Sequence, residues 1–172
     1  MKKYEFTGEV KLWFGRTLRQ IRATVAFGKV EAGEIGGWIE KEENLSHEGN
    51  AWVYDNALVC GDARVYGDAR VCGNARVCGD ARVCGDARVY GDAWVYGDVH
   101  FLTIGPIGSR GDVTTFFRTK ELEIYVKCGC FRGSIQAFAE QVQKTHGENR
   151  YGREYMAAIE LAKAHIDLTP EE

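Results

Sequence analysis

From Ala51 onward the chain repeats a six-residue motif, and this repeat constrains the fold more than any other feature. Nine units follow one another up to Ile104 without an insertion, and five of them read Ala-Arg-Val-X-Gly-Asp or Ala-Arg-Val-X-Gly-Asn, where X is Tyr or Cys. The first four positions alternate as in a short strand. The Gly-Asp or Gly-Asn pair that ends most units is typical of a turn, because both residue types tolerate a positive φ.

The alternation predicts a solenoid in which Ala and Val point inward while Arg, Tyr and Cys point outward. Three units of six residues would close one triangular coil of 18 residues, so the nine units would make three coils. Such coils would stack with neighbouring strands roughly 4.8 Å apart. The expected interior residues are Val53, Val59, Val65, Val71, Val77, Val83, Val89 and Val95, with Ala57, Ala63, Ala69, Ala75, Ala81, Ala87 and Ala93.

Residues 18 positions apart should share one of three outward faces. The least charged face would carry Leu58, Arg76, Trp94 and Tyr96. An exposed apolar patch of this kind usually meets a partner surface, so we expect it to contact another subunit or the C-terminal helices. The stacked pairs Arg64–Arg82 and Arg70–Arg88 are interpreted as solvated rows compensated by corner aspartates, with an anion or nucleotide surface as the alternative.

The flanking segments are interpreted as caps, because a solenoid exposes a sheet edge at each end. Residues 1–50 predict a β cap with two strands separated by Gly15-Arg16. A degenerate coil would follow, with Ile35, Ile39 and Leu45 inside and Trp38 sealing the end.

The C-terminal part departs from the repeat. We assign residues 51–104 to the solenoid and residues 105–172 to a small α+β module. The module would contain a Gly-rich loop at 103–112 and strands at 113–118 and 123–128. Its first helix would begin after Ser134 and end at Gly147, and its second would span about 149–166.

Composition excludes several classes of function. The net charge of −3 provides no bulk attraction to nucleic acid or membranes, so we expect neither as a partner. No apolar run suits a membrane span or a secretion signal, which predicts a cytoplasmic protein with reduced cysteines. Cys72, Cys78 and Cys84 would point in three directions, so we expect no metal site. We also expect no cofactor.

The Gly-rich segment is the most site-like local feature. Its backbone N–H groups could converge on an anion, with hydroxyl and guanidinium donors beside them. The candidate ligand-binding residues are Gly105, Gly108, Ser109, Arg110 and, facing the same loop, Arg132. A linker between the solenoid and its cap is the alternative interpretation of this segment.

The chain also resembles two groups of known proteins. The repeat resembles the left-handed parallel β-helix of hexapeptide-repeat proteins, and the left hand is implied by that resemblance alone. The motifs EIGGWIEKEENLSHEG, GDARVYGDARV, IGPIGSRGD and CGCFRG resemble a group of hexapeptide-repeat proteins from phages and prophages, of hypothetical or polymer-forming type. That group implies no catalytic residues for this chain, and a phage origin would imply antagonism of host defence.

We therefore expect a non-enzymatic, homo-oligomeric (trimer or dimer) binding protein for an anionic or nucleotide-like signal or a host protein. One alternative is an acyltransferase-like enzyme with an inter-subunit site at His100, since this architecture hosts such enzymes. The other is a structural or assembly protein.

Overall fold

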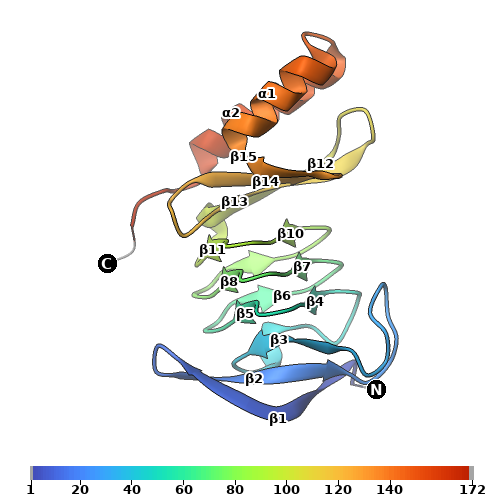
Figure 1. Cartoon of the computed structure of the whole chain (residues 1–172), viewed down its shortest axis with the longest axis vertical. Coiled ribbons are helices and arrows are strands. Elements are labelled where there is room, and N and C mark those ends of the chain that lie inside the picture. Colours follow the sequence, from blue (N-terminus) through green and yellow to red (C-terminus); the bar gives the residue numbers. More distant parts are fainter. Residues whose placement is uncertain (1, 171–172) are drawn as a thin grey trace. The chain divides into compact units, whose positions relative to one another are not determined.

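Residues 2–170, which the computed structural model describes, divide between Asp98 and Val99 into two units. The first unit contains the N-terminal cap and most of the repeat, and the second contains a sheet and two helices (Figure 1). The expected boundary at 104/105 lies too late in the chain, because Phe101 already begins the first strand of the second unit.

Each of the first eight hexapeptide units contributes one two-residue strand (Figure 1). The strands are β4 (Trp52–Val53), β5 (Leu58–Val59), β6 (Arg64–Val65), β7 (Arg70–Val71), β8 (Arg76–Val77), β9 (Arg82–Val83), β10 (Arg88–Val89) and β11 (Trp94–Val95). They pair in parallel as β4–β7–β10, β5–β8–β11 and β6–β9, so residues 18 positions apart lie side by side. The predicted phasing is confirmed.

The interior of the coils is built from the Val and Ala columns. All eight valines and all seven alanines predicted to face inward are 0% exposed. Backbone hydrogen bonds join successive coils, as from Trp52 N to Ala69 O (3.0 Å) and from Arg64 N to Ala81 O (2.9 Å). Gly67, at a corner, has a φ of +71°, which a side chain would strain. The predicted parallel β-solenoid with a C-terminal α+β module is confirmed.

The N-terminal cap continues one wall of the solenoid. The antiparallel hairpin β1 (Tyr4–Trp13) and β2 (Arg16–Ala23) pairs with β3 (Ile35–Ile39), and β3 pairs in parallel with β5. The resulting sheet has the order β1-β2-β3-β5-β8-β11. The hairpin therefore pairs along the free edge of β3, which leaves no open coil edge there.

A degenerate coil does precede the repeat, but with a different spacing. Ile39 pairs with Val59, and Leu45 bridges to Val65, so this coil is two residues longer than the others. Ile39 and Leu45 are buried as expected. Ile35 is 50% exposed, which contradicts its predicted place inside, because it pairs with β2 before the chain enters the coil.

Trp38 does not seal the end of the solenoid as expected. It pairs with Leu58 and lies on an outward face, where Lys11 Nζ sits 4.3 Å from the centre of its ring. The hairpin takes over the predicted sealing role, with Leu18 and Ile21 of β2 fully buried.

The second unit is an antiparallel meander with two helices. Its sheet runs in the order β12 (Phe101–Ile107), β13 (Asp112–Arg118), β14 (Ile124–Cys128) and β15 (Phe131–Ser134). The helices are α1 (Ile135–His146) and α2 (Arg150–His165). They pack on the sheet through a core that includes Phe116, Val126, Phe138 and Ile159. Neither helix has the length and apolarity that a membrane crossing requires.

The predicted caps of the first helix are confirmed. The Ser134 hydroxyl accepts the Ala137 N–H, and Gly147 ends the helix with a φ of +54°. The predicted Gly-rich loop is largely a strand instead. Residues 103–107 belong to β12, which pairs with β13 with a register shift between Ile104 and Ile107, and only 108–111 form a turn. Ile104 and Ile107 pack against the core formed with the helices.

Asn44, the last residue of the short 3-10 helix η1 (Glu42–Asn44), links the degenerate coil to the next one through side-chain hydrogen bonds. Its side chain is fully buried. Its Oδ1 accepts the Lys41 N–H (2.9 Å), and its Nδ2 donates to Gly61 O (3.1 Å) and Ala63 O (2.8 Å). One amide thus satisfies backbone groups of two successive coils.

Replacing Asn44 with Ala should lower the free energy of unfolding of the first unit by about 2–4 kcal/mol, because buried backbone groups lose their partners. The matched control is Asn50→Ala, which removes an exposed bond to Asp68 and should cost less than about 1 kcal/mol. All four tryptophans lie before residue 99, so urea unfolding followed by tryptophan fluorescence reports this unit. Equal losses in the two variants would contradict the linking role.

Candidate functional site

A cavity of about 290 Å³ in the second unit gathers the chemistry-bearing side chains of this part of the chain. Four segments surround it: the β12–β13 turn, the β14–β15 turn and one face each of α1 and α2. Its residues are Ser109, Arg110, Asp112, Cys128, Gly129, Cys130, Phe131, Phe138, Gln141, Val142, Thr145, His146 and Tyr155.

Aromatic rings form one side of the cavity. Phe138 of α1 contacts Phe131 at 5.1 Å between ring centres and Tyr155 at 5.5 Å. The Tyr155 hydroxyl lies 3.8 Å from Cys128 Sγ. Burial is the main cause that raises the pKa of Tyr155 to about 12, so its hydroxyl stays protonated at neutral pH. It can therefore act as a hydrogen-bond donor, while the rings provide an apolar wall.

Arg110 is the cationic side chain of the cavity lining. Its Nη1 lies 3.8 Å from Cys130 Sγ, at the tight turn between β14 and β15. A Cβ at Gly129 would come within 3.2 Å of the same nitrogen, so the glycine allows the guanidinium to lie against the turn. The Lys127 ammonium donates to Gly129 O in the same turn.

The turn at 108–111 does not form the anion nest that the sequence suggested. The Gly108 N–H donates to Glu154 Oε2 at 2.8 Å, and the same carboxylate accepts from Arg150 Nε at 2.9 Å. The backbone bond from Gly108 is the first cause that lowers the pKa of Glu154, which keeps that carboxylate charged. An internal carboxylate thus already occupies the donor predicted for a ligand.

The predicted ligand-binding residues are therefore only partly brought together. Ser109 and Arg110 line the cavity. Gly105 lies in β12 against Val113, and Arg132 is an exposed residue of β15 outside the lining. The linker interpretation is wrong for residues 105–107, which lie in strand β12 and end in the Ile107–Asp112 pair with β13.

Sequence reasoning missed His146 and Tyr155 as cavity residues. Tyr155 is buried in α2 on the same side as Ile159 and Ala162, and helical periodicity cannot show that such an apolar stripe borders a cavity. His146 stacks near Tyr155, with 5.8 Å between the ring centres. Only its position in the last turn of α1 brings it to the cavity.

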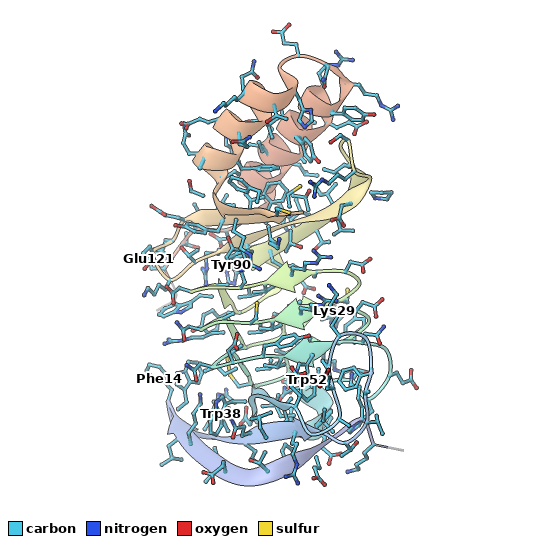
Figure 2. The ribbon with its side chains drawn as sticks, turned by 45° about the vertical axis from the view of Figure 1, so that its right-hand side comes forward. Phe14, Lys29, Trp38, Trp52, Tyr90 and Glu121 are labelled. Carbon is cyan, nitrogen blue, oxygen red and sulfur yellow. A yellow bond between two sulfur atoms is a disulfide. The ribbon has the colours of Figure 1, made fainter. Side chains whose placement is uncertain are left out.

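The least charged solenoid face is partly covered by its own chain. Leu58 is 4% exposed and packs with Leu18 and Trp13 of the hairpin, so the expectation that it contacts another subunit is wrong. The Arg76 guanidinium lies between the Trp13 ring (5.4 Å) and the Trp94 ring (4.7 Å). Phe14, in the turn between β1 and β2, is 84% exposed (Figure 2). For Arg76, Trp94 and Tyr96, contact with another subunit stays a prediction.

A disulfide joins Cys60 and Cys78, whose Cα atoms are 4.6 Å apart. The expectation of reduced cysteines is wrong for this pair, because stacking one coil apart brings the two residues within disulfide range. Disulfides are rare in the cytosol, so this bond does not favour the predicted cytoplasmic location. That location stays a prediction. Among residues 2–170 no group of three or more His, Cys, Asp or Glu side chains could hold a metal ion.

His100, the residue proposed for an acyltransferase site, closes the short helix η2 (Asp98–His100). Its side chain is buried, with 7% exposed. An inter-subunit active site at this position would require the imidazole to become accessible.

Comparison with known proteins gives matches within the hexapeptide repeat. Residues 59–73, 63–79, 69–83 and 81–97 match the family model described as the YdcK beta solenoid repeat. A stretch of 38 residues is 55% identical to the uncharacterized acetyltransferase YdcK of Escherichia coli (strain K12), and covers 22% of this chain and 12% of YdcK. The similarity supports a hexapeptide-repeat β-solenoid, and membership of the phage-encoded group stays a prediction.

The role of Gly108 can be tested with a matched pair of glycines in the β12–β13 turn. A Cβ at Gly108 would overlap the Tyr155 hydroxyl, whereas at Gly111 the nearest atom is 4.0 Å away. Both residues have positive φ values, so Gly111→Ala should cost about 1 kcal/mol from backbone strain alone. Gly108→Ala should cost about 2–4 kcal/mol, because overpacking adds to the strain.

The measurement is urea unfolding followed by circular dichroism at the helical wavelength, because both α-helices of the described residues belong to the second unit. Equal destabilisation by the two substitutions would show that Tyr155 does not pack against the turn.

Proposed function

We propose that this chain is a non-enzymatic binding protein whose C-terminal cavity holds a small ligand with a planar apolar part and an anionic group. The observation that carries the proposal is the placement of Arg110 beside a wall of three aromatic rings in one cavity. A nucleotide combines both features of such a ligand, which agrees with the nucleotide-like signal expected from the sequence.

The size of the cavity limits the ligand. At about 290 Å³ it lies at the lower end of the range of small-molecule pockets, which is roughly 300–1,000 Å³. A mononucleotide, or one end of a larger nucleotide, is therefore the scale of ligand that we propose. Aromatic walls bind planar groups through burial and stacking, and require little reorganisation.

The polar groups provide the orientation. A guanidinium binds phosphate or carboxylate oxygens through two parallel hydrogen bonds, and such charge-assisted bonds are the strongest in proteins. The Ser109 hydroxyl lies in the same turn, and the protonated Tyr155 hydroxyl lies at the aromatic wall. A ligand with its ring against Phe131 or Phe138 and its anionic group at Arg110 would use both regions.

The solenoid would act in this proposal as a rigid scaffold that assembles into a homo-oligomer, either a trimer or a dimer. Arg76, Trp94 and Tyr96 remain the proposed contact residues of that assembly. Sequestration of an anionic signal, including antagonism of host defence by a phage-encoded protein, is the biological role that we propose for such a scaffold.

Replacing Arg110 with Gln should weaken the binding of adenosine 5′-monophosphate by about tenfold or more, because a charge-assisted contact is lost. The matched control is Arg132→Gln, which removes the same charge from an exposed position outside the cavity and should change affinity less than about twofold. Isothermal titration calorimetry measures both. Equal weakening in the two variants, or no measurable binding by the unaltered chain, would reject the proposal.

An acyltransferase is the second candidate, because the repeat is similar to a protein named as an acetyltransferase. If our first proposal holds, the chain should release no coenzyme A from acetyl-coenzyme A above the buffer rate in the presence of amine acceptors. Release that is abolished in His100→Ala, with helical circular dichroism unchanged, would instead support the enzyme.

A further inference from the structure

A second cavity lies entirely within the first unit, along the β6–β9 ladder of the solenoid. It is an open groove of about 790 Å³. One side carries Arg64 and Arg82, and the other is the segment from η1 to His47. The Leu45–Val65 bridge joins the two sides, so the backbone fixes the groove at its base.

The two arginines are held side by side by the ladder. Arg64 of β6 pairs directly with Arg82 of β9, and both side chains are exposed. Neighbouring parallel strands are roughly 4.8 Å apart, so two positive charges occupy adjacent positions. In the described part of the chain, neither guanidinium has a carboxylate oxygen within 4.0 Å.

The other outward arginines differ in their surroundings. The Arg76 guanidinium is stacked between two indole rings. Arg70 and Arg88, which are also one coil apart, share their cavity with the carboxylates of Asp68 and Asp86.

Arg64 and Arg82 share their groove with Glu42 and Glu43. The Asp98 carboxylate accepts the backbone N–H of Arg82 at 2.9 Å. Within residues 2–170, however, neither guanidinium of the groove is stacked between rings or paired with a carboxylate.

His47 lines the groove as a neutral side chain. Its Nδ1 accepts the Lys3 N–H at 3.1 Å, so the neutral ring carries its proton on Nε2. Burial is the main cause that lowers the pKa of His47, which favours this neutral form. Among residues 2–170 Nε2 has no hydrogen-bond partner, but it is buried and lies 3.8 Å from Glu42 Oε2, so it offers no exposed donor to a ligand in the groove.

The remaining groove side chains restrict the ligand. Tyr66 is 40% exposed and presents an aromatic ring beside Arg64. Lys2 binds the Glu42 carboxylate at 2.6 Å, which leaves Glu43 as the other acidic side chain of the lining. The positive row is thus only two residues long and has carboxylates at its side, which disfavours an extended polyanion such as nucleic acid.

We propose that this groove is a ligand site for the diphosphate group of a small organic molecule. Each guanidinium would bind one phosphoryl group, and the organic part would rest on the Tyr66 ring. The site is separate from the C-terminal cavity and does not depend on the function proposed for it.

Inorganic pyrophosphate is the probe, titrated by calorimetry into the full chain carrying Arg110→Gln, so that the C-terminal cavity does not contribute. Adding Arg64→Gln together with Arg82→Gln should weaken binding by at least about tenfold, because two charge-assisted contacts are lost. The control adds Arg70→Gln together with Arg88→Gln, which makes the same change of net charge on another face. It should alter affinity by less than about twofold.

Glu43→Gln should tighten pyrophosphate binding several-fold, because it removes the lining carboxylate that Lys2 does not bind. Tryptophan fluorescence during urea unfolding checks that each variant is folded. The proposal is overturned if the parent chain does not bind pyrophosphate, or if the two double variants weaken it equally, since equal weakening indicates attraction by net charge alone.

Discussion

The backbone ladder between coils is the constraint on which the first unit depends. Each strand is only two residues long, so its hydrogen bonds cannot be satisfied within one coil and must go to the coil above or below. That pairing requires an interior narrow enough for Val and Ala, which are buried without exception at the predicted positions. It also brings every outward side chain next to the residue 18 positions away, as with Arg64 and Arg82.

The same stacking explains features of very different chemistry. It brings Cys60 and Cys78 within disulfide range and lines up Leu58, Arg76 and Trp94 on one face. At the N-terminal end of the stack, the described residues provide no further coil to pair with the edge of β3. The β1–β2 hairpin pairs with that edge instead, and its Trp13 also covers part of the apolar face. Capping the sheet and shielding the patch are thus achieved by one element.

The two cavities are built by different means. The groove beside Arg64 and Arg82 follows from the repeat, because the ladder places like residues side by side. The C-terminal cavity needs two turns and two helices to converge, and Arg110, Cys130 and Tyr155 come from three of these segments. The first arrangement suits a repeating charge on a ligand, and the second suits a ligand with chemically distinct ends.

The six-residue period by itself determined the solenoid, its inward columns and the neighbours on each outward face, because a fixed period leaves one phase for every residue. Local signals likewise located both helices and the cap at Ser134. The sequence could not show that Gly108 would bind Glu154, that Trp13 would cover Leu58, or that His146 and Tyr155 would border Arg110. Those contacts join residues far apart in the chain, and no local pattern encodes them. They arise only when the hairpin, the sheet and the helices pack, so the tertiary structure alone decided them.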